Sequence, residues 1–147
     1  MTKHTKRSQN IKNLNTEKEG ITILRELVNG FMLPSKEQRK HVYEICNIDY
    51  KKYSRSVDGI VLNVKSFDLI KSEKDFYFVE IKTTNSKNVK KLPYNVFFGF
   101  TKNEEDLFKK LDNYRLCIVH TGMREYKMIS FEAYENLIQY QINFKGK

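Results

Sequence analysis

Residues 75–84, Asp-Phe-Tyr-Phe-Val-Glu-Ile-Lys-Thr-Thr, carry the pattern that decides the fold. Aromatic and β-branched residues are enriched in strands, so this stretch predicts a β-strand. Because alternate side chains of a strand share one face, Glu80 and Lys82 point the same way, roughly 6–7 Å apart. The same face carries Phe76 and Phe78 nearer the start of the strand. Glu-x-Lys alone also fits a solvated surface, but an ion pair at the end of an apolar face favours a cleft.

A second strand is predicted over residues 56–65, and the polar link at 71–74 suits a hairpin turn. Antiparallel pairing of the two strands would bring Asp58, at the start of the first, beside Glu80 and Lys82. Asp-Gly is also a common turn dipeptide, so Asp58 has a purely local explanation as well. The alternating apolar residues that follow it favour the strand. Two carboxylates and an ammonium are therefore expected at one end of a sheet.

The rest of the chain alternates between helical and strand patterns. Hydroxyl residues followed three positions later by Glu or Gln predict helix starts after Thr16, Ser35 and Thr101. The further expected elements are a helix over 17–30, a helix after Ser35, a strand over 95–101, a helix over 103–112, strands over 114–120 and 126–130, and a helix over 131–139. This order predicts an α/β sandwich with a central mixed sheet flanked by helices. Residues 1–15 are expected to form a basic, flexible arm, and residues 16–147 a single domain.

Composition sets limits on the class of protein. At 147 residues, 39% of them hydrophobic, the chain can bury one core. It contains no apolar run of the roughly 20 residues that a bilayer span needs, and the first residues lack the apolar stretch of a signal peptide. A cytoplasmic protein without membrane contact is therefore expected. Cys46 and Cys117 are too far apart for a zinc site and are expected to be reduced packing residues.

The net charge of +9 is distributed unevenly. Residues 1–16 and 81–103 contain lysines or arginines but no acid, and the second block starts at the candidate site. Positive potential would therefore surround the site where a phosphate backbone could lie. The basic residues that we expect to contact DNA are Arg55, Lys87, Lys90, Lys91 and Lys102.

Asp58 followed, after a hairpin, by Glu80-x-Lys82 resembles the catalytic signature of the PD-(D/E)xK nuclease superfamily. The resemblance extends over about residues 55–130 and includes Val79-Glu80-Ile81-Lys82-Thr83-Thr84. It departs from the family pattern in having Val57 where a proline often precedes the aspartate. The resemblance implies the three-layer restriction-endonuclease-like sandwich.

The resemblance also implies the roles of the site residues. Asp58, Glu80 and the backbone carbonyl of Ile81 would bind Mg²⁺, or Mn²⁺ in its place, through the oxygen ligands that such ions prefer. Lys82 would orient a water molecule and offset negative charge in the transition state. A glutamate of the first helix is often a further ligand in this fold, and the sequence does not decide among the candidates. These are Glu17, Glu19 and Glu26, with Glu19 as a working choice.

The function expected from this resemblance is Mg²⁺-dependent hydrolysis of double-stranded DNA. A type II restriction endonuclease, or the small catalytic subunit of a heterodimeric one, fits the size of the chain. Cutting both strands would require a homodimer or a second protein subunit. A Holliday-junction resolvase or a repair nuclease of the same fold is an alternative, and so is a non-catalytic nucleic-acid-binding protein. The absence of a glycine-rich phosphate loop in the sequence gives nucleotide hydrolysis no support.

Overall fold

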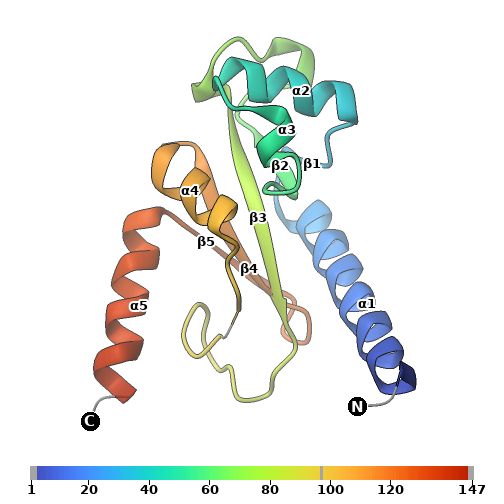
Figure 1. The fold of residues 1–147 in the computed structure, drawn as a ribbon, viewed down its shortest axis with the longest axis vertical. Helices are drawn as coiled ribbons and strands as arrows, with labels where there is room; N and C mark the ends of the chain where they lie inside the picture. The colour runs from blue at the N-terminus through green and yellow to red at the C-terminus, as the bar shows by residue number, and fades with distance from the viewer. Residues whose placement is uncertain (1–2, 97, 146–147) are drawn as a thin grey trace.

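The computed structural model describes residues 3–96 and 98–145, with side chains over 15–96 and 98–141, as a mixed five-stranded sheet with helices (Figure 1). The strands are β1 (Phe31–Met32), β2 (Gly59–Leu62), β3 (Phe76–Thr84), β4 (Tyr114–His120) and β5 (Glu125–Ile129). The helices are α1 (Lys3–Leu27), α2 (Lys36–Ile45), α3 (Tyr50–Tyr53), α4 (Lys102–Lys110) and α5 (Phe131–Lys145), with short 3₁₀ turns η1 (Phe67–Leu69) and η2 (Glu73–Asp75). The predicted α/β class with a mixed sheet is confirmed.

The strands lie in the sheet in the order in which they follow along the chain. β3 and β4 pair in parallel, and the other neighbouring strands pair antiparallel. A parallel pair needs a crossover connection, and the segment that contains α4 supplies it. β3 is the longest strand and runs through the middle of the molecule, so its far end extends beyond the end of β2 (Figure 1).

Both faces of the sheet are buried under helices. Phe76 and Phe78 belong to the larger core cluster, to which α2, α4 and α5 contribute apolar residues. On the opposite face Val79 and Cys117 pack against Ile23 and other residues of α1. Side chains of β3 therefore alternate between the two faces of the sheet, as predicted. Both faces are covered by helices, and neither is an open solvent face. Cys46 and Cys117 are both buried and unlinked, as expected of packing residues.

Two of the three predicted helix starts are formed. Ser35 accepts a hydrogen bond from the Gln38 N–H, and the Gln38 side chain accepts one from the Ser35 N–H. Thr101 and Glu104 make the same reciprocal pair at α4. These contacts satisfy N–H groups that have no partner within the helix.

The first helix differs from its prediction. α1 begins at Lys3, so residues 3–15, expected as an aperiodic arm, have a helical backbone and Thr16 lies inside the helix. Neither proline nor glycine occurs between residues 3 and 19, so nothing in this segment stops the helix. No helix among residues 3–96 and 98–145 has the length and apolar character needed to span a bilayer.

Two predictions between the strands were wrong. The segment 95–101, apart from residue 97, which lies outside the described residues, forms no strand. Its aromatic side chains are used for packing instead: the Phe100 ring stacks on Phe108 of α4 with 5.8 Å between centroids. The link between β2 and β3 is also no tight turn at 71–74, because it contains η1 and η2. The aromatic residues of the first segment are used in packing and the second segment is polar, as the composition indicates. The composition did not predict the secondary structure of either segment.

A short strand not expected from the sequence, β1, pairs with β2 and depends on Gly30. Gly30 has a φ of 89°, which favours glycine, and its carbonyl accepts a hydrogen bond from Leu62 N–H at 2.9 Å. A Cβ atom at this position would lie 2.6 Å from the Leu62 carbonyl oxygen.

Gly30→Ala is therefore expected to lower the free energy of unfolding by about 1–3 kcal/mol, because both the strained φ and the backbone clash must be relieved. Urea denaturation followed by circular dichroism measures this change. Gly99→Ala is the matched control, because a Cβ there has no atom within 4 Å. Equal stability of the two variants would contradict the role of Gly30.

Candidate active site

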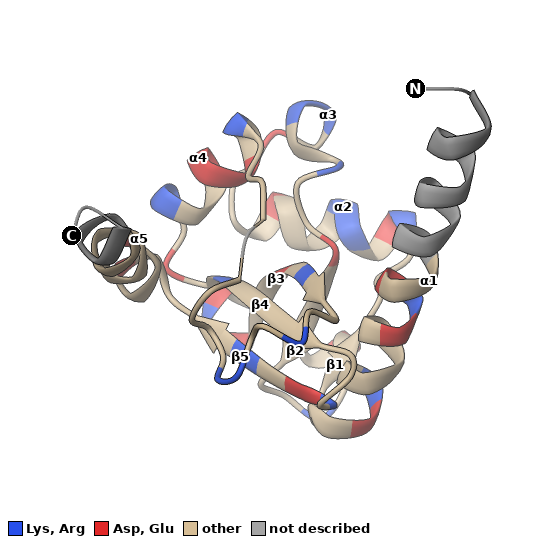
Figure 2. Cartoon of the chain, turned by 90° about the horizontal axis from the view of Figure 1, so that it is seen from below, with Lys and Arg blue, Asp and Glu red and all other residues tan. Residues whose placement is uncertain are grey.

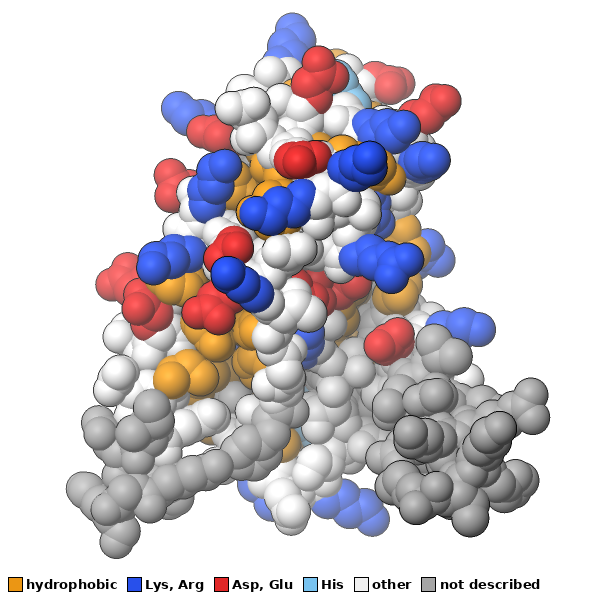
Figure 3. All heavy atoms as spheres, viewed as in Figure 1, with side chains coloured by type: hydrophobic (Ala, Val, Ile, Leu, Met, Phe, Trp, Pro, Cys, Tyr) orange, Lys and Arg blue, Asp and Glu red, His pale blue; other side chains and the backbone are white. Residues whose placement is uncertain are grey.

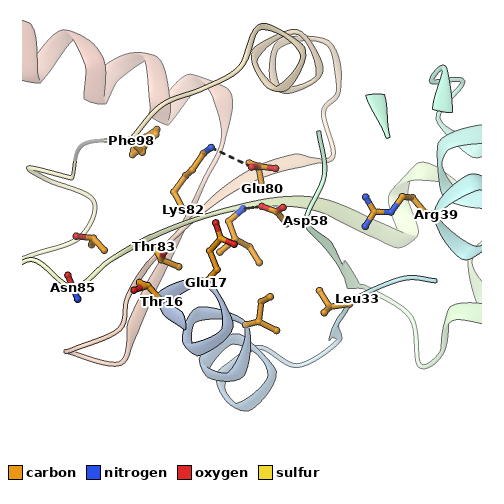
Figure 4. A pocket seen from close by; sticks show the side chains of 13 residues that line it. Thr16, Glu17, Leu33, Arg39, Asp58, Glu80, Lys82, Thr83, Asn85 and Phe98 are labelled. Atoms are coloured by element: carbon orange, nitrogen blue, oxygen red, sulfur yellow. Dashed lines mark hydrogen bonds and ion pairs between the residues drawn. The ribbon is translucent and has the colours of Figure 1, made fainter. Parts of the chain in front are cut away.

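Pairing of β2 with β3 determines where Asp58 lies. Gly59 is opposite Val79 in the antiparallel ladder, and the Asp58 N–H donates to the Val79 carbonyl at 3.0 Å. β2 begins at this point, and the Asp58 side chain takes over the next pairing position: its Oδ2 accepts a hydrogen bond from Ile81 N–H at 2.8 Å. Asp58 is thereby held opposite Glu80, as the predicted strand pairing required (Figure 4).

The loop that leads into Asp58 is held by side chains from distant parts of the chain. Arg39 Nη1 donates to the carbonyls of Ser54 and Val57, at 3.0 and 2.7 Å. The hydroxyl groups of Tyr43 and Tyr114 donate to the carbonyls of Tyr53 and Ser56, each at 2.6 Å. Burial raises the pKa of both phenols, that of Tyr43 to about 12, so these hydroxyl groups remain donors at neutral pH.

Glu80 and Glu104 form a buried acidic pair bridged by Lys82. The exposed fractions of Glu80 and Glu104 are only 4% and 5%. Lys82 Nζ lies 3.5 Å from Glu80 Oε1 and 3.3 Å from Glu104 Oε1, and 5.3 Å from the centre of the Phe100 ring. The ammonium group therefore lies near two carboxyl groups and one aromatic ring.

The charge of this cluster is not fully compensated. No hydrogen-bond donor among the described residues reaches Glu80 Oε2, although the atom is buried. Burial, the adjacent Glu104 carboxyl group and the charge of Asp58 raise the pKa of Glu80 to about 11, and Lys82 offsets only part of this. The pKa of Glu104 is lowered: its burial is outweighed by Glu80, the Thr101 N–H and Lys82. In the metal-free site Glu80 therefore carries a proton and Glu104 the negative charge.

Glu104 was assigned only a capping role from the sequence. Its Oε1 does accept the Thr101 N–H at 2.9 Å, but the same atom also contacts Lys82 Nζ. Nothing in the local pattern separates these two uses, because the second depends on how α4 packs on the sheet beside β3. Only the burial of Glu104 indicates its second role, and burial is known only from the tertiary structure.

A cavity of about 610 Å³ opens over the site and is lined by Asp58, Glu80, Lys82 and residues of α1. Glu17 lines it and extends from α1 toward Asp58 (Figure 4). Glu19, the working choice of an additional ligand, does not line this cavity. It lines a separate hollow with Arg124, because residues two positions apart on a helix are about 200° apart around the axis. Of the three candidate glutamates, Glu17 is the one that lines the site cavity. Glu26 forms an ion pair with Arg124.

The backbone of Ile81 offers one more oxygen to the site. N–H and C=O of a strand residue point to the same edge, and the Ile81 N–H points to Asp58, beyond the start of β2. The Ile81 carbonyl therefore faces the same side of β3 as the two carboxylates. Within the described part of the chain no three His, Cys, Asp or Glu side chains are arranged to hold a metal ion by themselves. A metal bound here would be held by Asp58, Glu80 and this carbonyl, with Glu17 in reach of the cavity.

The predicted DNA-contacting residues fall into two groups. Arg55 and Lys102 line one hollow between α3 and α4. Lys87, Lys90 and Lys91 are exposed on the segment that follows β3. In the space-filling view, acidic atoms are recessed near the middle of one face, and Lys and Arg side chains lie on both sides of them (Figure 3).

Comparison with known proteins identifies no relative: no protein-family model, curated protein or solved structure matches the chain. The functional argument therefore depends on the geometry and chemistry of the site.

Glu80→Gln is expected to stabilise the metal-free protein above neutral pH. Because the pKa of Glu80 is near 4.5 when unfolded and about 11 when folded, the folded state binds more protons between these values. The free energy of unfolding of the wild type should therefore fall as pH rises through this range. At pH 8 the variant should be more stable by about 1–3 kcal/mol, because its neutral amide needs no proton to be buried, whereas the wild type must take one up to fold.

Urea denaturation from pH 5 to pH 9 in the presence of a chelator measures this difference. Glu105→Gln is the matched control, since Glu105 is an exposed glutamate of α4 and its replacement should change neither the stability nor its pH dependence. Identical pH dependence in the wild type and Glu80→Gln would contradict the assignment of a protonated Glu80.

Proposed function

We propose that this chain is a Mg²⁺-dependent endonuclease that hydrolyses phosphodiester bonds of DNA, with the restriction-endonuclease-like fold of the PD-(D/E)xK superfamily. One observation carries the proposal: Asp58, Glu80 and Lys82 meet at the end of an apolar sheet face, where the buried Glu80 Oε2 has no donor from the described part of the chain. A structural protein gains nothing from this arrangement, because burying a carboxyl group that has an unpaired oxygen is costly. A functional site that binds a cation recovers that cost.

The donor atoms fit a hard divalent cation. Asp58 and Glu80 supply carboxylate oxygens and Ile81 a carbonyl oxygen, the ligand type that Mg²⁺ and Mn²⁺ prefer. Mg²⁺ keeps several waters, so a set of two or three protein ligands suffices when a phosphate oxygen completes it. When bound, the metal would polarise the scissile phosphate and lower the pKa of water.

The residues of the chain would divide the remaining work. Lys82 carries donors that can hold a water molecule beside the phosphate and a positive charge that offsets the negative charge of the transition state. Glu104 fixes the position of the Lys82 ammonium from the opposite side, at 3.3 Å. Asp58, held by Ile81 N–H, keeps its carboxylate aimed at the cavity. The cavity of about 610 Å³ leaves room for the phosphate between these groups and α1.

The biological use that best fits this site is restriction, by a type II enzyme or by the small catalytic subunit of a heterodimeric one. One site of this kind cuts one strand, so cleavage of both strands requires a second copy of the chain or another subunit. A resolvase or a repair nuclease would use the same site on a different DNA structure. A non-catalytic nucleic-acid-binding protein is favoured only by the net charge of +9.

Glu80→Ala and Lys82→Ala are expected to reduce Mg²⁺-dependent cleavage of plasmid DNA by at least about 100-fold, the scale of losing an electrostatic catalytic group. Conversion of supercoiled plasmid to nicked or linear forms on an agarose gel measures this rate. Glu105→Ala and Lys109→Ala are matched controls, because both residues are exposed on α4. Undiminished cleavage by the two site variants would exclude this active site.

Mg²⁺ is expected to stabilise the wild-type protein but not Asp58→Asn. Binding to the folded state alone adds about 2.7 kcal/mol when the metal concentration is about 100 times its Kd. Thermal denaturation at increasing Mg²⁺ concentration, with Ca²⁺ and Mn²⁺ as comparisons, measures the effect. An equal rise in melting temperature for both proteins would show that the ion binds elsewhere.

A further inference from the structure

A second hollow, of about 630 Å³, lies between α3 and the start of α4. We call it the basic hollow and define it by Lys51, Lys52 and Arg55 on one side and Lys102 and Asn103 on the other. Figure 2 shows basic segments of α3 and of one end of α4 facing each other above the sheet. The two sides are connected, since Asn103 Nδ2 donates to the Lys52 carbonyl at 3.1 Å.

The charges of the basic hollow are unbalanced. No Asp or Glu is among the residues that line it, whereas two lysines of α3, Arg55 and Lys102 all do. Lys102 is the first residue of α4, where the helix dipole is positive and a cation is unfavourable. Of the acids in that first turn, Glu104 is turned inward to Lys82, and Glu105 does not line the hollow. Like charges gathered at a positive helix end are stabilised by a bound anion.

The basic hollow is continuous with the candidate active site through the backbone. Ser56, which lines the hollow, is separated from Asp58 by one residue, so their Cα atoms lie at most about 7 Å apart. On the other side Asn103 directly precedes Glu104. Successive phosphates along one strand of duplex DNA rise by about 3.4 Å and are displaced further by the helical rotation, so their separation is comparable with this distance. A strand whose scissile phosphate lies at Asp58 and Glu80 would place a neighbouring phosphate in the basic hollow.

We propose that the basic hollow binds the sugar–phosphate backbone of duplex DNA next to the cleaved phosphate and is the main electrostatic anchor of the substrate. The position of the scissile phosphate rests on the proposed function, whereas the anchoring of DNA is tested without any cleavage. The basic segment that follows β3, with Lys87 and Lys90, is then a secondary contact. Lys87 and Lys90 are not among the residues that line the hollow or the site cavity.

The test measures binding of the full chain to a short fluorescently labelled DNA duplex, by anisotropy, with Ca²⁺ in place of Mg²⁺ and at several salt concentrations. Arg55→Ala/Lys102→Ala is compared with Lys71→Ala/Lys74→Ala, which removes the same charge from the link between β2 and β3 at the outer end of the molecule (Figure 1). Lys87→Ala/Lys90→Ala forms a third arm. All six residues are exposed, so folding should be retained in each variant.

The hollow variant is expected to bind DNA about tenfold or more weakly at 0.1 M salt, with the slope of log K against log salt reduced by about 2. The control on the β2–β3 link should change affinity less than about twofold, as a charge outside the contact does. Equal losses in the hollow variant and this control would overturn the proposal. So would a loss confined to Lys87→Ala/Lys90→Ala, or a wild-type protein that binds no DNA. Weakened binding by the hollow variant alongside absent cleavage by the wild type would uphold the anchor and reject the nuclease.

Discussion

Antiparallel pairing of β2 with β3 is the interaction on which both the core and the candidate site depend. The ladder ends at the pair Gly59 and Val79. Beyond this pair the Asp58 side chain accepts the hydrogen bond that Ile81 N–H of β3 donates. A shift of one residue would turn every side chain of β3 to the opposite face. Phe78 would then leave the larger core, and Glu80 would move to the side covered by α1. Register and site geometry are therefore set by the same buried aromatic residues.

The candidate site lowers the stability of the fold. Glu80 lies in the middle of β3, after Phe76, Phe78 and Val79, which are fully buried, and the attraction of Lys82 does not compensate for its desolvation. The surrounding structure is correspondingly rigid: Arg39, Tyr43 and Tyr114 all hold carbonyl groups of the loop before Asp58. These hydrogen bonds keep the acidic groups of the site at defined positions, because an unsupported loop would move until the groups were solvated.

Helix α4 contributes residues to both the candidate active site and the basic hollow. Its position in the crossover between β3 and β4 is required by their parallel pairing. Its first turn supplies Glu104 to Lys82 on the inside and Lys102 to the basic hollow on the outside. A single helix terminus thus borders both the buried acidic pair and the basic surface. The basic residues of the hollow would attract DNA, whereas exposed carboxylates would repel it. Burial of Glu80 and Glu104 keeps these carboxyl groups away from the basic surface.

The sequence by itself determined the elements whose signals are local. The strand over 75–84, the starts of α2 and α4, and the common face of Glu80 and Lys82 all follow from backbone periodicity and from side chains that bond within three residues. The meeting of Asp58 with Glu80 also followed, because the pairing of neighbouring strands restricts the register. These predictions needed no knowledge of distant residues.

Only the tertiary structure decided which further side chains join the site. Glu17 rather than Glu19 faces the cavity because the rotation of α1 about its axis is set by its packing on the far face of the sheet. Glu104 reaches Lys82 because α4 packs on the sheet at β4, the neighbour of β3, and Phe100 packs against Phe108 of α4 where the sequence predicted a strand. Each of these outcomes depends on contacts between residues far apart in the chain, and periodicity carries no information about them.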